Sequence, residues 1–304
     1  MHSYAIADVF TENPLEGNPV AVFFDAEDIP AARMQRIARE MNLSETTFVL
    51  PARRGGDARV RIFTPVNELP FAGHPTLGTA IVLDEFRTAG PSDRPGRSNR
   101  IRLETAMGII PFDFERSDGR ATSARMRQPI PVWELYEHAD ELLAALGLPS
   151  SSLPVESYRN GPRHVFVGLD SVAALSRVEP DLRALAKLPD MAVNCFAGSG
   201  SNYRMRMFSP AYGVAEDAAT GSAAGPAALH LLRHGLVSFG QWIELVQGVE
   251  IGRPSIMRAR VVGSPGEGRD EAVLIETGQI EAGQIEAIEV SGCAVVVARG
   301  MLRV

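Results

Sequence analysis

One short pattern occurs twice in this chain of 304 residues, and it constrains the fold more than any other feature. The first copy, Arg61–Pro65, is followed by Ala72–Pro75, and the second, Arg206–Pro210, is followed by Thr220–Ala223. Each copy predicts a strand, a loop and a small-residue turn at the start of a helix. Two such units predict two similar halves whose helix N-termini face one cleft. Because free N–H groups at helix starts favour anions, we expect a small carboxylate-bearing ligand.

Length and charge limit the classes of protein that fit. A chain of 304 residues corresponds to about two domains, and its 45% hydrophobic content allows an ordinary core. The net charge of −7 argues against a nucleic-acid partner or an anionic membrane surface. The N-terminus has no signal-peptide pattern and no apolar run reaches a membrane span, so we expect a cytoplasmic protein.

Periodicity predicts the elements and the division of the chain. Helices are expected at 29–41, 75–86, 139–146, 171–188 and 221–234. Strands are expected at 4–10, 19–24, 46–50, 58–64, 165–168, 192–196, 203–208, 241–247, 255–262, 272–276 and 294–297, with three more between 97 and 128. The prolines of 129–131 suit a linker, since X-Pro steps resist both helix and sheet. We therefore predict one half at 1–128, with the C-terminal strand 293–304 returning to it, and a second half at 129–292. The repeat at 279–287 is expected to be a local duplication.

The two predicted helix starts admit a local structural interpretation. If His74 is the N-cap residue, Pro75 takes the first helical position, where its missing N–H costs nothing. If Ser222 is the N-cap residue, Pro226 lies at the fourth helical position and still needs no intrahelical donor. At this point His74 and Ser222 are either helix caps alone or helix caps that also bind a ligand.

Three titratable residues lie on predicted loops at the ends of elements: Glu45, His74 and Asp217. Loops on a rigid scaffold often carry catalytic groups, and such a set suits proton transfer at a carbon atom. For each residue alone, an exposed loop charge is the commoner explanation, so only the combination points to a site.

Other motifs give no cofactor or metal site. Gly198-Ser199-Gly200 lacks the third glycine of a dinucleotide motif, and no Walker sequence occurs. His230 and His234 have zinc-protease spacing without the glutamate between them, so we expect His234 to interact with its helix dipole. Cys195 and Cys293 are expected to be buried, inert thiols. The predictions are therefore no cofactor and no metal.

Four blocks carry a family resemblance: Gly17–Val22, Met41–Thr46, Phe71–Pro75 and Glu216–Ala223. Together they closely resemble the phenazine-biosynthesis isomerase family, and the likeness covers essentially the whole chain. The resemblance implies a diaminopimelate-epimerase-like α/β (α+β) fold, with two pseudo-symmetric halves that each wrap a sheet around a central helix. That epimerase has a catalytic cysteine in each half. The matching turns here have none, which argues against racemisation by two thiols.

The resemblance also implies an activity and roles for single residues. It implies cofactor-free isomerisation of a dihydro-hydroxyanthranilate in a homodimer, with Glu45 taking a proton from C3 and helping to return one to C1. His74 and Asp217 would orient the ring, while Ser222 and the backbone amides of Gly73 and Gly221 would hold the carboxylate. We expect desolvation in a closed cleft to raise the pKa of Glu45. Two alternatives stay open: a related isomerase or epimerase that acts on another amino-acid-like carboxylate, and a non-catalytic binding protein on the same fold.

Overall fold

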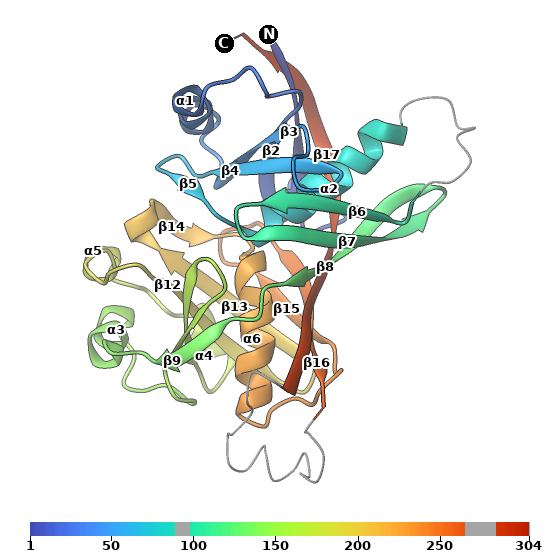
Figure 1. The fold of residues 1–304 in the computed structure, drawn as a ribbon. Coiled ribbons are helices and arrows are strands. Elements are labelled where there is room, and N and C mark those ends of the chain that lie inside the picture. Colours follow the sequence, from blue (N-terminus) through green and yellow to red (C-terminus); the bar gives the residue numbers. More distant parts are fainter. Residues whose placement is uncertain (89–97, 265–283, 304) are drawn as a thin grey trace. The chain divides into compact units, whose positions relative to one another are not determined.

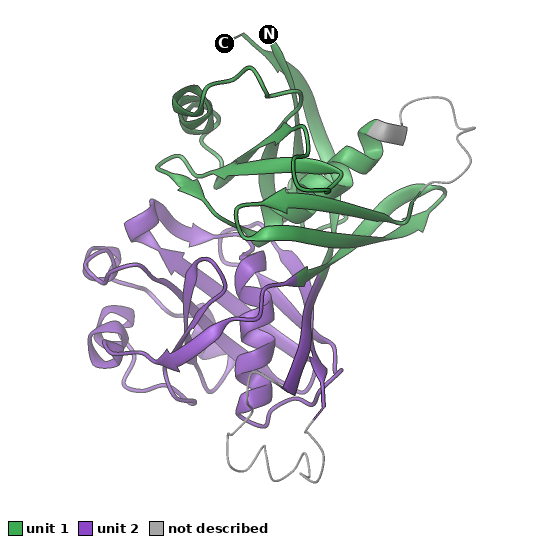
Figure 2. Ribbon diagram, viewed as in Figure 1, with its two compact units in different colours: residues 1–127, 291–304 green, residues 128–290 purple. Residues whose placement is uncertain are grey.

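The computed structural model describes residues 1–88, 98–264 and 284–303, and it divides into two compact units (Figures 1 and 2). The first unit comprises Met1–Arg127 and Ser291–Val304, and the second comprises Gln128–Val290. The sequence-based division placed the junction after 128 and the return at 293. The observed units thus differ from it by one residue at the junction and by two at the return.

The first unit is a sheet with two helices. Its elements are β1 (His2–Val9), β2 (Asn18–Phe23), α1 (Ala31–Met41), β3 (Glu45–Leu50), β4 (Ala58–Phe63), β5 (Glu68–Leu69), α2 (Gly73–Thr88), β6 (Arg100–Thr105), β7 (Gly108–Ser117), β8 (Arg120–Gln128) and the end of β17 (Ile285–Leu302). β17 pairs with β1 over the whole length of β1 and is far longer than the predicted strand at 294–297. The segment 89–96, whose composition predicts a polar loop, lies outside the described residues, as do the predicted strand at 272–276 and most of the 279–287 repeat.

The second unit repeats this plan with more helices. Its elements are β9 (Val132–Leu135), α3 (Ala139–Leu146), β10 (Glu156–Arg159), β11 (Arg163–Gly168), α4 (Val172–Ser176), α5 (Leu182–Leu185), β12 (Ala192–Ser199), β13 (Asn202–Ser209), the 3₁₀ turn Pro210–Tyr212, β14 (Val214–Asp217), α6 (Gly221–Arg233), β15 (Ile243–Gln247) and β16 (Ser255–Gly263). The single helix predicted at 171–188 is wrong. Pro180 interrupts it because proline lacks an N–H, and the Asp181 side chain then caps α5 by accepting from two backbone N–H groups.

The pairing of the strands shows the internal repeat. In the first unit β2–β3 is parallel, β3–β4 antiparallel and β4–β6 parallel. In the second unit β11–β12, β12–β13 and β13–β15 follow the same order. One helix precedes the last parallel strand in each case: α2 contacts β1 to β4, β6 and β7, and α6 contacts β11 and β16. α6 is buried from Gly221 to Leu232, as expected of a helix that a sheet surrounds. The predicted fold class, two similar halves that each hold a central helix, is confirmed.

The repeated arginine has the same role in both units. Arg61 Nε and Nη2 donate to both carboxylate oxygens of Glu68, each at 2.7 Å. Arg206 Nε and Nη2 donate to Glu216 at 2.9 and 2.8 Å. Each guanidinium also lies over the ring two residues further on, at 5.1 Å for Phe63 and 5.0 Å for Phe208. The pattern thus encodes a bidentate ion pair that joins neighbouring strands just before each central helix.

Alternation along the strands of the second unit separates two packing layers. Val165, Val167, Val193 and Cys195 pack under α3, α4 and α5. The intervening Phe166 points to the other side, where its ring stacks on His230 of α6 at 5.4 Å. Burial raises the pKa of Cys195 to about 12, as expected of an inert thiol. The prediction that Cys293 is buried is wrong, because this thiol in the first unit is partly exposed and contacts Glu12.

Candidate active site

In the first unit, the candidate residues Glu45 and His74 lie next to each other. Glu45 opens β3 after the left-handed residue Asn42 ends α1, and His74 is the second residue of α2. His74 Nε2 lies 3.3 Å from Glu45 Oε2, which is an ion-pair distance without good hydrogen-bond alignment. α2 starts at Gly73, so the prediction that His74 is its N-cap is wrong. The ring belongs to the first helical turn and points at Glu45.

Buried polar groups surround the His74 ring. The Ser44 hydroxyl donates to Asn18 Oδ1 at 2.8 Å, which leaves Asn18 Nδ2 facing His74 Nδ1 at 3.3 Å. Burial lowers the pKa of His74 to about 3, while the Pro19 carbonyl opposes this shift. The ring is therefore neutral at pH 7, and it lies beside Glu45 without a positive charge.

In the second unit, Asp217 ends β14 and is 7% exposed. Its Oδ2 accepts from the Thr220 hydroxyl at 2.8 Å. Gln247, at the end of β15, forms hydrogen bonds to the loop that carries Asp217 and Thr220. Its Nε2 lies 2.9 Å from the Asp217 carbonyl oxygen and 3.0 Å from Thr220 Oγ1. The Thr220 N–H donates to Gln247 Oε1 at 3.2 Å. The Asp217 carboxylate is therefore held in place by buried polar groups.

The prediction that Ser222 is the N-cap of α6 is also wrong. Thr220 occupies the capping position without a side-chain cap, because its hydroxyl is bound to Asp217. Pro226 consequently lies inside the helix, where it cannot donate to the Ser222 carbonyl four residues earlier. Asn160 Nδ2 supplies that hydrogen bond at 2.9 Å, and Gln128 Nε2 donates to the Gly221 carbonyl at 2.7 Å. The first turn of α6 is thus held from outside by two buried amides.

The sequence reasoning missed these supporting residues. Asn18 lies inside a block that carried the family resemblance, whereas Asn160 and Gln247 lie outside the four blocks, and nothing in the type of these residues indicated a partner. One signal was available: a proline inside a helix leaves a carbonyl that needs another donor. Pro226 therefore pointed to an external donor to Ser222, although it could not identify Asn160.

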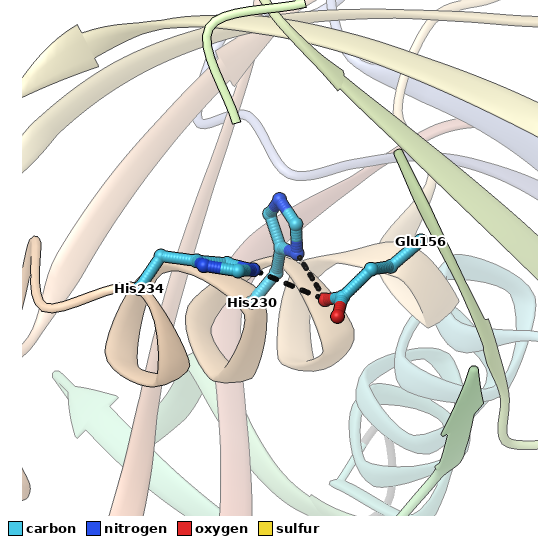
Figure 3. Close-up of side chains that lie close together, drawn as sticks. All are labelled: Glu156, His230 and His234. Carbon is cyan, nitrogen blue, oxygen red and sulfur yellow. Dashed lines mark hydrogen bonds and ion pairs between the residues drawn. The ribbon is translucent and has the colours of Figure 1, made fainter. Parts of the chain in front are cut away.

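A second polar cluster lies on α6 away from these residues. Figure 3 shows the Glu156 carboxylate of β10 beside His230 Nδ1 and His234 Nε2, at 3.2 and 3.1 Å. By spacing these three could hold a metal ion. However, Arg233 Nη1 lies 2.6 Å from the same oxygen, so a guanidinium already neutralises the carboxylate, and we assign no metal there.

The electrostatics of this cluster fit a structural ion pair. Burial alone would raise the pKa of Glu156, but hydrogen bonds from His230, His234, Arg233 and Tyr158 bring it well below its usual range. Burial lowers the pKa of His230 to about 4. His234, predicted to interact with the helix dipole, lies at the C-terminal end of α6 and also contacts Glu156.

The predicted site residues therefore form two groups. The first unit holds Glu45, Gly73 and His74, and the second holds Asp217, Gly221 and Ser222. A common cleft between the two helix starts stays a prediction. Within the described residues, no helix combines the length and the apolar character needed to cross a membrane.

Comparison with known proteins adds the family. Over residues 7–300 the chain matches the family described as phenazine biosynthesis-like protein. It is 62% identical over 264 residues to trans-2,3-dihydro-3-hydroxyanthranilate isomerase of Pseudomonas aeruginosa, covering 87% of this chain and 92% of the relative. The enzyme of that name from Pseudomonas fluorescens is 58% identical over 302 residues, covering 99% of each. A crystal structure of a Bacillus anthracis phenazine biosynthesis protein of the PhzF family shares the fold, with a TM-score of 0.81 at 24% identity and coverage of 100% and 99%. The chain belongs to the phenazine biosynthesis-like protein family.

Proposed function

We propose that this protein is a trans-2,3-dihydro-3-hydroxyanthranilate isomerase and serves phenazine biosynthesis. The relatives that are 58% and 62% identical carry that name, and one of them matches almost the whole chain. The reaction breaks the C3–H bond, shifts the double bonds of the ring and forms a C1–H bond. Substrate and product therefore have the same composition, and the enzyme has only to move protons.

Glu45 is the acid and base of this reaction. The observation that carries the assignment is the neutral His74 ring, whose Nε2 faces Glu45 Oε2 at 3.3 Å. A neutral imidazole does not neutralise the carboxylate with a fixed positive charge. Glu45 can therefore accept the C3 proton and release one again to C1.

Asp217, Ser222 and the backbone amides of Gly73 and Gly221 bind the substrate. Asp217 accepts from the amine or hydroxyl group of the ring. Gly73 and Gly221 each begin a helix, where backbone N–H groups are free to bind a carboxylate. Ser222 supplies a hydroxyl beside the second of these helix starts.

Three finer features belong to the proposal. The reaction needs no cofactor or metal, because proton transfer by a carboxylate is sufficient for it. The enzyme works in the cytoplasm as a homodimer. Its partner is a small carboxylate-bearing substrate, without nucleic acid or membrane.

Turnover by the purified protein tests the proposal. The wild type, after exhaustive dialysis against chelator, is incubated with trans-2,3-dihydro-3-hydroxyanthranilate, and the product is followed by NMR and mass spectrometry. We expect conversion to an isomer of unchanged mass. Absence of conversion, or a requirement for added metal or cofactor, would contradict it. Turnover of a different carboxylate alone would favour the alternative of a related isomerase.

A further inference from the structure

The network of Asp217, Thr220 and Gln247 fixes which of its atoms donate and which accept. All three residues lie in the second unit, and Gln247 is fully buried. The Asp217 carbonyl can only accept, so the group 2.9 Å from it must be the Gln247 NH₂. The Thr220 N–H can only donate, so the group 3.2 Å from it must be the Gln247 carbonyl. Two backbone groups thus determine the orientation of the amide.

This orientation determines the direction of the Thr220 hydroxyl. Gln247 Nε2 has no lone pair to offer, so Thr220 Oγ1, at 3.0 Å, accepts from it. The single hydroxyl hydrogen is then left for Asp217 Oδ2 at 2.8 Å. That oxygen is consequently an acceptor, which favours the ionised carboxylate.

The backbone leaves this network little freedom. Gln247 is the last residue of β15, and Gly248 follows with φ +76°. A Cβ atom at Gly248 would lie 2.6 Å from the Ala218 carbonyl oxygen and 2.3 Å from that of Arg253. The end of β15 is therefore packed directly against the loop that carries Asp217 and Thr220, and Gln247 cannot easily move away.

We infer that Gln247 is a positioning residue that acts through Thr220 to hold Asp217 as an ionised hydrogen-bond acceptor. An ionised carboxylate can accept from an amine or hydroxyl donor on the substrate. This inference rests on the proposed role of Asp217 in substrate binding. It adds two residues that touch no substrate but determine which kind of group Asp217 recognises.

The protonation of Asp217 can be measured without any substrate. Selective ¹³C labelling of aspartate carboxyl groups, with Asp217→Asn to assign the signal, gives the pH at which Asp217 takes up a proton. In Thr220→Val, which keeps the shape but removes the hydroxyl, we expect this midpoint to rise by about one pH unit. Gln247→Glu, which loses the NH₂ donor, should give a rise in the same direction. Thr220→Ser keeps the hydroxyl and should restore the wild-type midpoint.

A matched control separates this effect from general destabilisation. Thr47→Val removes a buried hydroxyl that bonds to Thr79 and to the Ala21 carbonyl in the first unit. It should lower the melting temperature without moving the Asp217 midpoint. A midpoint in Thr220→Val equal to that of the wild type, or an equal shift in Thr47→Val, would overturn the inference.

Kinetics provide the second readout. In Thr220→Val the acidic limb of the pH profile of kcat/KM should move to higher pH by the same amount as the midpoint. If the wild type fails to turn over the substrate but the NMR midpoint shifts, the proposed function is wrong and the network inference stands. If the wild type is active and neither the midpoint nor the limb shifts, the inference alone is wrong.

Discussion

Because Pro226 lies inside α6, the stability lost in Asn160→Ala can be predicted. Asn160→Ala removes the side-chain amide that donates to the Ser222 carbonyl, and both residues are buried. A buried carbonyl without a partner costs about 1–3 kcal/mol. For a unit of this size, about 2 kcal/mol corresponds to a fall of about 4–8 °C in the melting temperature.

Replacing the proline should remove much of this cost. In Pro226→Ala the backbone regains an N–H that can donate to the Ser222 carbonyl, so the loss of the Asn160 amide leaves that oxygen satisfied. We expect Asn160→Ala to cost about 1–2 kcal/mol less in the Pro226→Ala background than in the wild type. The cost of the cavity left by the truncated side chain is the same in both backgrounds, so it cancels when the two costs of Asn160→Ala are subtracted.

The assay is urea denaturation of the four proteins, followed by circular dichroism, with thermal melts alongside. Asn194→Ala is the matched control, because this buried amide donates to the nearby Ala192 carbonyl and has no link to Pro226. Its cost should be the same in both backgrounds. An equal cost of Asn160→Ala with and without Pro226 would refute the reasoning.

Three further perturbations test other parts of the structure. Burial lowers the pKa of His164 to about 3, against about 6.5 in the unfolded chain, so the unfolded state takes up the proton first as the pH falls. The free energy of unfolding should therefore fall as the pH drops from about 6.5 toward 3. A free energy that does not change with pH, or a pH dependence that His164→Leu leaves unchanged, would contradict this. Glu156→Gln leaves Arg233 buried without its counter-ion and should cost about 3–5 kcal/mol in urea unfolding, whereas Glu68→Gln, at the more exposed pair with Arg61, should cost about 1 kcal/mol or less. Ser222→Ala should weaken calorimetric binding of 3-hydroxyanthranilate by about 1.5–3 kcal/mol but hardly affect the analogue without a carboxylate; equal losses for the two ligands would remove the hydroxyl from the site.

The repeated pattern was enough to predict the architecture because the same strand, loop and helix-start sequence occurs once in each half. Strand alternation and the arginine two residues before a phenylalanine predicted β4 and β13, and the small-residue turns predicted α2 and α6. The helix expected at 171–188 is two short helices, because Pro180 lies between them and has no N–H to continue a helix. β17 was too short in the prediction since its length depends on pairing with β1, nearly the whole chain away.

The candidate site was predicted in part for the same reason. Glu45 and His74 belong to recognisable blocks, and the structure brings them within 3.3 Å. The residues that support the two groups of candidate site residues were not predictable, because these hydrogen bonds join segments that are distant in sequence. The separation is 26 positions for Ser44 and Asn18, and 62 for Asn160 and Ser222. The helix caps were wrong because α2 and α6 begin at Gly73 and Gly221, so His74 and Ser222 already lie inside their helices. At the capping position of α6, the Thr220 hydroxyl is bound to Asp217, three residues earlier.

Transfer of the C3 proton tests the central claim most directly. Substrate deuterated at C3 is converted in a single turnover by the wild type and by Glu45→Gln, and the position of the label is read by NMR and mass spectrometry. We predict that the wild type reacts more slowly with the deuterated substrate, removes deuterium from C3 and delivers part of it to C1. Glu45→Gln should stay folded, bind the substrate and leave the label at C3. Near-wild-type conversion by Glu45→Gln, with the label moved from C3, would contradict the account.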